Sequence, residues 1–103
     1  MMKDKRVVLT GASSGLGAAL AHTLAEQGAK LALFATHPER LETVAQECRA
    51  SGAEVLVDTG DVAQAKDVQA TVLRAAEAWG GIDFVIANAG ISMWVRFDEV
   101  EDP

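Results

Sequence analysis

The chain has 103 residues, half of them hydrophobic, and a formal net charge of −6. This length suffices for one small domain. The acidic balance and the lack of any lysine or arginine cluster argue against nucleic acid and anionic membrane surfaces as partners. No apolar run is long enough to span a bilayer and no signal-peptide core is visible, so we expect a cytoplasmic protein. The single cysteine, Cys48, cannot form an internal disulfide, and no Cys/His cluster has metal-ligand spacing, so we expect no metal.

Four short apolar runs predict the strands of a sheet. They do not alternate with polar residues, which is typical of parallel strands covered on both faces. The runs are Val7–Thr10, Leu31–Ala35, Val55–Val57 and Phe84–Ala87. Helix-period segments separate them, which indicates βαβ units with right-handed crossovers. We therefore predict an α/β fold with a doubly wound parallel sheet, the first half of a Rossmann fold, with strand order 3-2-1-4.

Apolar residues at helical spacing predict three helices between these strands. The expected buried stripes are Leu16, Leu20 and Leu24, then Leu41, Val44, Ala45 and Cys48, then Ala65, Val68, Val72, Ala76 and Trp79. The glycines expected to end the three helices are Gly28, Gly52 and Gly80. Two pairs are spaced like capping boxes that open the second and third helices, namely Thr36 with Glu39 and Asp61 with Gln64.

A glycine-rich stretch, residues 10–17, directly follows the first strand and leads into the first helix. Gly11 allows a sharp turn off the strand, and Gly17 allows the helix to pack closely on the sheet. Gly15 lets the backbone approach a ligand, and a β-branched residue there would fill that space and resist a positive φ. The N-terminus of a helix offers unpaired N–H groups and partial positive charge, so this stretch predicts a pyrophosphate site.

Three motifs in register resemble those of the short-chain dehydrogenase/reductase family, in its compact subtype. They are Thr-Gly-x-x-x-Gly-x-Gly at 10–17, Asp-Val at 61–62 and Asn-Ala-Gly at 88–90. The family usually has two asparagines in the last motif, and Ala87 replaces the first of them.

The resemblance implies a cofactor role for each motif. The residues it places around the pyrophosphate and the adenosine ribose are Gly11, Ser13, Ser14, Gly15, Leu16 and Gly17. It implies that Asp61 accepts a hydrogen bond from the adenine amino group and that the Val62 backbone contacts the edge of the adenine ring. The residues it places beside the nicotinamide ribose are Asn88, Ala89 and Gly90. Simpler interpretations stay open from the residues alone: Asp61 as a helix cap, the two serines as turn formers and Asn88 as a strand-end hydrogen bond.

The resemblance also implies a hydride-transfer reaction on an alcohol or carbonyl substrate. The family uses a serine, a tyrosine and a lysine, whereas this sequence has no tyrosine and no lysine after the fourth strand. We therefore expect no catalytic residue here. We expect residues 1–103 to be one cofactor-binding half-domain, truncated at its C-terminus, of a full-length oxidoreductase that forms homo-oligomers. The fourth strand would then be an open edge, so we also expect self-association or low thermal stability.

The end of the second strand predicts the choice of cofactor. NAD-preferring relatives place an acid there for the ribose 2′-hydroxyl, and this carboxylate repels a 2′-phosphate. Here Thr36 and His37 follow the strand, with no acid before Glu39, so we expect the Thr36 hydroxyl and His37 to bind the 2′-phosphate. Although the usual arginine of NADP-specific relatives is missing, we expect NADP(H) to be favoured over NAD(H).

Other classes of function compete with this hypothesis. One is a nucleotide-binding sensor or interaction module without catalysis, and another is a structural fragment without activity. A Rossmann-type methyltransferase fits less well, because it would need an acidic residue after the second strand.

Overall fold

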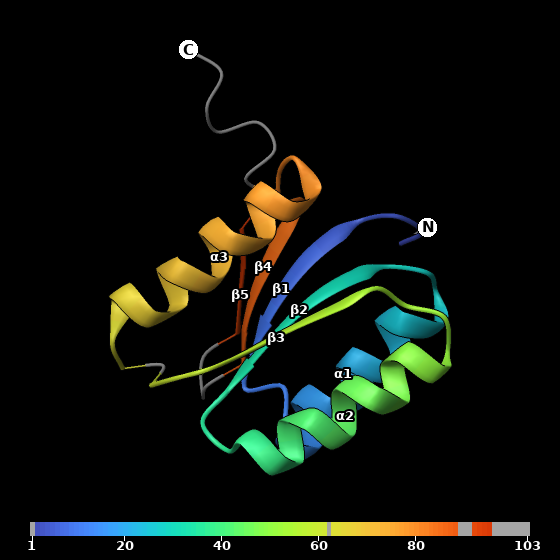
Figure 1. Cartoon of the computed structure of the whole chain (residues 1–103), viewed down its shortest axis with the longest axis horizontal. Helices are drawn as coiled ribbons and strands as arrows, with labels where there is room; N and C mark the ends of the chain where they lie inside the picture. Colours follow the sequence, from blue (N-terminus) through green and yellow to red (C-terminus); the bar gives the residue numbers. More distant parts are fainter. Residues whose placement is uncertain (1, 62, 89–91, 96–103) are drawn as a thin grey trace.

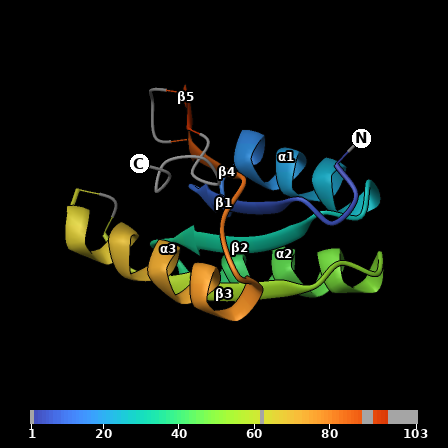
Figure 2. The ribbon, with the colours of Figure 1, turned by 90° about the horizontal axis from the view of Figure 1, so that it is seen from above.

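The structure, a computed structural model, describes residues 2–61, 63–88 and 92–95. Its helices and strands follow one another in the order β1 (Arg6–Thr10), α1 (Gly15–Glu26), β2 (Lys30–Ala35), α2 (Pro38–Ala50), β3 (Val55–Thr59), α3 (Ala65–Trp79), β4 (Phe84–Asn88) and β5 (Ser92–Val95). The sheet order is β3-β2-β1-β4-β5, with β1 to β4 parallel (Figures 1 and 2). The predicted fold class and the predicted strand order 3-2-1-4 are therefore confirmed.

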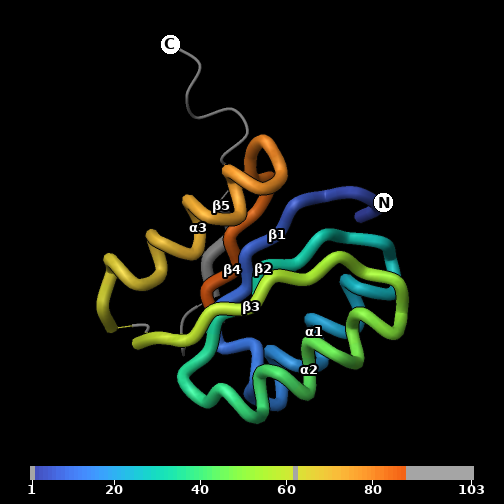
Figure 3. Tube along the Cα trace, viewed as in Figure 1, coloured from blue at the N-terminus to red at the C-terminus, as the bar shows by residue number. Residues whose placement is uncertain are grey.

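The sheet separates two apolar layers because successive side chains of a strand point to opposite faces. Val7 and Leu9 belong to the cluster that contains the buried residues of α1 and α2, whereas Val8 packs in the cluster that contains Ala75 of α3. Figure 1 shows the same arrangement, with α1 and α2 on one side of the sheet and α3 on the other. The connections between parallel strands all have the same hand, because the chain runs one way along the sheet through α1 and α2 and returns through α3 on the other face (Figure 3).

The glycines predicted to end the helices do so. Gly28 and Gly52 have φ values of +86° and +97°, and each donates its N–H three residues back, to Ala25 and Arg49. The next N–H groups reach the carbonyls of Leu24 and Cys48, which completes a Schellman turn at both helix ends. Gly80, with a φ of +77°, caps α3.

The two predicted capping boxes are wrong. The N-cap of α2 is His37 and not Thr36, and the N-cap of α3 is Gln64 and not Asp61. Neither N-cap side chain accepts a hydrogen bond from its helix. Pro38 explains the first shift, since proline is preorganised for the first helical position and needs no acceptor there.

Two of the predicted apolar stripes are too long at their N-terminal ends. Leu16 is 70% exposed, and Ala65 is also exposed. Both residues lie in the first turn of their helix, beyond the part that covers the sheet. The face of α1 that packs is made of smaller residues, Gly17, Ala21 and Ala25, with Leu24. The predicted stripe of α2 is confirmed, including burial of Cys48, whose thiol pKa is raised by that burial.

The fourth strand is not an open edge as predicted. β5 pairs with it antiparallel, from Val85 opposite Val95 to Asn88 opposite Ser92. The missed signal is the β-prone run at 93–95, which follows β4 too closely for a parallel crossover. At the opposite edge, two arginine side chains cover carbonyl groups of β3: Arg49 donates to Val55 and Arg74 to Val57, both at 3.0 Å.

An ion pair that the sequence analysis missed joins the starts of β1 and β4. The Arg6 guanidinium donates from Nε and Nη2 to the two carboxylate oxygens of Asp83, at 2.9 and 3.0 Å. The backbone N–H of Arg6 adds a third bond, at 2.8 Å. These hydrogen bonds lower the pKa of Asp83 from 3.8 to about 2, against the effect of its burial.

Candidate functional site

The candidate site begins at the turn between β1 and α1. Gly11 has a φ of +67°, the left-handed conformation that glycine adopts without strain. The N–H and the hydroxyl of Ser14 both donate to the Gly11 carbonyl, at 3.3 and 2.9 Å. The N–H of Ala12 donates to Phe34 of β2 at 3.2 Å, so the turn is fixed to the neighbouring strand. Ser14 therefore acts as a turn former, one of the two interpretations left open.

The first turn of α1 has open space at Gly15. A Cβ placed on Gly15 would meet no heavy atom within 4 Å. Among the described residues, no acceptor lies on the N–H groups of Gly15, Leu16 and Gly17, which form the first turn of the helix. That turn carries no acidic residue. The space, the donors and the helix dipole together suit an anion.

The turn needs no positive φ at Gly15, because its left-handed residue is Gly11. Gly15 is already helical, so a side chain there strains nothing in the backbone. Gly17 is buried, in agreement with its predicted role in close packing of α1.

A second part of the site is the loop after β3. Asp61 is exposed, and its Oδ1 accepts the N–H of Ala63 at 2.9 Å, while its carbonyl accepts the N–H of Gln64 at 2.9 Å. This is an Asx turn and not a helix cap, since α3 begins at Ala65. In the part of the chain that the structure describes, Oδ2 of Asp61 has no hydrogen-bond partner.

A third part lies after β2, where Thr36 and His37 are both exposed. His37 lines a hollow of about 430 Å³ with Pro38, Glu39 and Arg40. His37 is the N-cap of α2 and Arg40 lies in its first turn, and both line this hollow. The sequence analysis missed Arg40.

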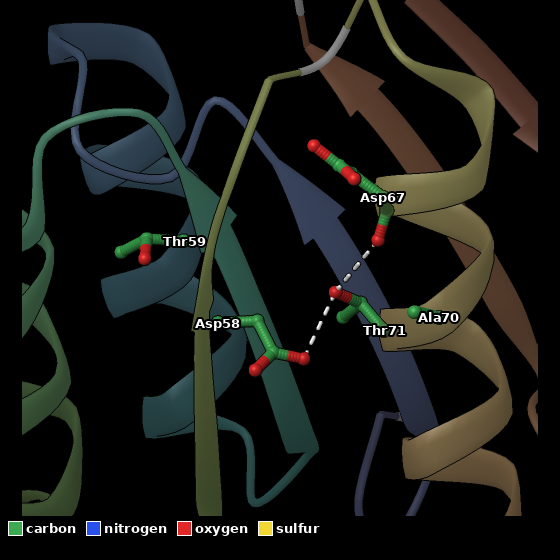
Figure 4. Close-up of a pocket in the computed structure, with 5 residues that line it drawn as sticks. All are labelled: Asp58, Thr59, Asp67, Ala70 and Thr71. Atoms are coloured by element: carbon green, nitrogen blue, oxygen red, sulfur yellow. Dashed lines mark hydrogen bonds between the residues drawn. The ribbon is translucent and has the colours of Figure 1, made fainter.

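A smaller hollow, of about 190 Å³, lies between β3 and α3 and was not predicted. It is lined by Asp58, Thr59, Asp67, Ala70 and Thr71 (Figure 4). The Thr71 hydroxyl donates to Asp58 Oδ2 at 3.0 Å. Arg74 Nη1 pairs with the other oxygen of Asp58 at 3.2 Å.

The fold brings these parts to the edge of the sheet that is formed by the C-terminal ends of its parallel strands, because these ends all lie on the same side. The turn after β1, Thr36 after β2, Asp61 after β3 and Asn88 at the end of β4 all lie there. Ligands of open α/β sheets bind at this edge. Ser13 is half-buried within the glycine turn. The predicted residues Val62, Ala89 and Gly90 lie outside the described residues.

Over residues 2–61, 63–88 and 92–95, no three His, Cys, Asp or Glu side chains gather as a metal site would require. Within the same ranges, no helix combines the length and the apolar character that crossing a bilayer demands.

Comparison with known proteins identifies the family. The family described as short chain dehydrogenase matches residues 5–103, nearly the whole sequence. The chain belongs to the short-chain dehydrogenase family. The resemblance drawn from the three sequence motifs is thereby confirmed, and members of this family use a nicotinamide dinucleotide, NAD or NADP.

Individual relatives agree with this assignment. An uncharacterized oxidoreductase of Listeria innocua is 43% identical over 90 residues, which cover 87% of this chain and 36% of the relative. An 11-beta-hydroxysteroid dehydrogenase-like protein of Arabidopsis thaliana is 40% identical over 96 residues, 92% of this chain and 31% of the relative. The chain thus spans about a third of the length of these relatives, and it corresponds to their N-terminal part.

Solved structures of the family share the fold. The crystal structure of levodione reductase superposes with a TM-score of 0.81 at 40% identity, over 88% of this chain and 36% of that one. NAD⁺-bound xylitol dehydrogenase gives a TM-score of 0.81 at 34% identity, over 87% and 35% of the two chains.

Proposed function

We propose that the chain binds a nicotinamide dinucleotide and is the cofactor-binding part of an oxidoreductase that transfers hydride between this cofactor and an alcohol or carbonyl substrate. The observation that carries the proposal is the open N-terminus of α1. Among the described residues its first-turn N–H groups have no acceptor, a Cβ on Gly15 would meet no heavy atom within 4 Å, and no acidic residue of that turn opposes an anion. The names of levodione reductase and xylitol dehydrogenase agree with carbonyl and alcohol chemistry.

In this proposal each part of the site holds one part of the cofactor. The N–H groups of Gly15, Leu16 and Gly17 bind the pyrophosphate, helped by the dipole of α1. Asp61 Oδ2, the carboxylate oxygen that the Asx turn does not use, accepts a hydrogen bond from the adenine amino group. Val62 contacts the edge of the adenine ring. The residues beside the nicotinamide ribose are Asn88, Ala89 and Gly90. The cofactor, when bound, supplies or accepts the hydride.

We further propose that NADP(H) is favoured over NAD(H). No carboxylate stands directly after β2 to repel a 2′-phosphate, and at about 4 Å such repulsion would amount to about 4 kcal/mol at an effective dielectric of 20. His37 and Arg40 line the same hollow, where the Arg40 guanidinium supplies positive charge and the His37 imidazole can hydrogen-bond to the phosphate, with the Thr36 hydroxyl nearby in sequence. Glu39 lines this hollow as well and reduces the preference.

Titration of the chain with NADH and NADPH, followed by the fluorescence of the reduced nicotinamide, tests both proposals. We expect both cofactors to bind, NADPH more tightly. The variant His37→Asp should reverse the preference by at least tenfold, because it adds a carboxylate directly after β2. If neither cofactor binds, the first proposal is refuted. A preference of the unmodified chain for NADH above tenfold would refute the second.

The proposal also limits what these residues do. The sequence has no tyrosine, so the tyrosine that the family uses as its general acid cannot come from these 103 residues. We therefore expect the chain alone to bind cofactor without turning over substrate. Oxidation of NADPH by the chain with a simple ketone or aldehyde, above the rate of a cofactor-only control, would contradict this.

A further inference from the structure

Asp67 connects the first turn of α3 to the loop that carries Asp61. Its Oδ2 accepts the backbone N–H of Asp61 at 3.0 Å. The same oxygen lies 3.0 Å from the position that a Cβ on Gly60 would occupy. The carboxylate is therefore bonded to Asp61 and lies where a side chain at residue 60 would need space, and Figure 4 shows it above Thr71 at one end of the smaller hollow.

The other hydrogen bonds that the structure describes for the loop do not attach it to α3 through a side chain of that helix. The N–H of Gly60 donates to Ala35 of β2 at 3.2 Å, which holds the loop on the sheet side. The Asx turn of Asp61 is internal to the loop and ties it to nothing else. Among the described residues, the Asp67 carboxylate is the one side chain of α3 that bonds to the loop.

The hydrogen bond between the Asp61 N–H and the Asp67 carboxylate is also charge-assisted. A carboxylate that accepts a backbone N–H makes a charge-assisted hydrogen bond, about twice as strong as a neutral one. It fixes the peptide group immediately before the Asp61 Cα and so limits the directions in which the Asp61 side chain can point.

We propose that Asp67 is a positioning residue for the cofactor: by holding the Asp61 backbone it aims the Asp61 carboxylate at the amino group of adenine. This inference rests on the proposed function, since it requires that a dinucleotide binds at this edge of the sheet. It assigns Asp67 no contact with the cofactor itself.

Asp58 provides a matched control. It lines the same hollow as Asp67 and its carboxylate also accepts a hydrogen bond from α3, but that bond comes from Thr71 and does not involve the loop. Each alanine variant removes one carboxylate and its hydrogen bond from the same region, and Asp58→Ala also removes the ion pair with Arg74. Both variants should lower the thermal midpoint, whereas only Asp67→Ala should affect adenine recognition.

The test compares a cofactor with its hypoxanthine analogue, which lacks the adenine amino group. Whichever of NADH and NADPH binds the unmodified chain more tightly is titrated, with its analogue, into the unmodified chain and into Asp67→Ala, Asp67→Asn and Asp58→Ala. We expect Asp67→Ala to weaken binding of the adenine cofactor by at least fivefold and of the analogue by less than twofold. Asp67→Asn keeps an acceptor oxygen and should bind the adenine cofactor within about twofold of the unmodified chain.

Each outcome bears on one proposal. Failure of the unmodified chain to bind any cofactor contradicts the proposed function and with it this inference. Normal binding by Asp67→Ala contradicts the inference alone. Equal weakening of cofactor and analogue by Asp67→Ala, or weakening by Asp58→Ala of the same size, would assign Asp67 a structural role only and would also overturn the inference.

Discussion

The ion pair between Arg6 and Asp83 makes the stability of the fold depend on pH in a defined way. Asp83 is 5% exposed, and its carboxylate accepts three hydrogen bonds, all from Arg6. The variant Asp83→Asn removes the charge with little change in volume. It removes the negative charge that faces the Arg6 guanidinium at the start of β1.

The size of the effect follows from the pKa. A carboxyl whose pKa is lowered from 3.8 in the unfolded chain to about 2 in the folded one contributes roughly 2 to 2.5 kcal/mol of stability at neutral pH. Because the folded-state pKa is the lower one, this contribution is complete above pH 3.8 and is lost as the pH falls toward 2. By pH 3 roughly half of it should be gone.

Urea unfolding of both proteins, followed by circular dichroism at several pH values from 7 to 3, measures this contribution. We expect Asp83→Asn to be less stable by at least roughly 2 kcal/mol at pH 7. The difference between the two proteins should shrink steadily below pH 4. A difference that stays constant over the whole range would show that the Asp83 charge is not what Arg6 stabilises.

Two further variants separate cofactor binding from folding. Gly15→Val should reduce cofactor affinity at least tenfold, because the side chain enters the space before the first turn of α1, and should leave the thermal midpoint nearly unchanged, because Gly15 has neither a positive φ nor a close neighbour; unchanged affinity in a titration would place the phosphate elsewhere. Asp61→Ala should cost about 1.5–3 kcal/mol of cofactor affinity through loss of a charged hydrogen-bond acceptor. Its thermal midpoint should fall only slightly, because the Asx turn is local; a large loss of stability with intact affinity would contradict the adenine assignment.

The sequence predicted the regular parts of the fold because the signals there are local. Apolar runs of parallel strands and glycines after helices each reflect one element and its immediate ends, as at Gly28 and Gly52. The helix starts were less predictable. Thr36 and Asp61 have the right residue types for caps, but Pro38 and the Asx turn at Asp61 move the start of each helix toward its C-terminus.

The candidate site divides in the same way. The glycine turn could be read from spacing, since its chemistry depends on backbone groups and on the absence of side chains. Arg40 and Asp67 could not be predicted in this way. The role of Arg40 depends on the hollow that it lines with His37, and the role of Asp67 depends on its hydrogen bond to the backbone of Asp61, six residues away in the chain. The pair of Arg6 and Asp83 is separated by 77 residues and becomes visible only when β1 and β4 lie side by side.

The most direct test of the central claim is a titration of the ¹⁵N-labelled chain with NADPH, followed through its backbone amide resonances. The account predicts the largest shifts at Gly15, Leu16 and Gly17, whose N–H groups would bind the pyrophosphate, with a second group of shifts around Asp61. Unchanged resonances at the first turn of α1 in the presence of saturating cofactor, or shifts confined to another face of the sheet, would contradict it.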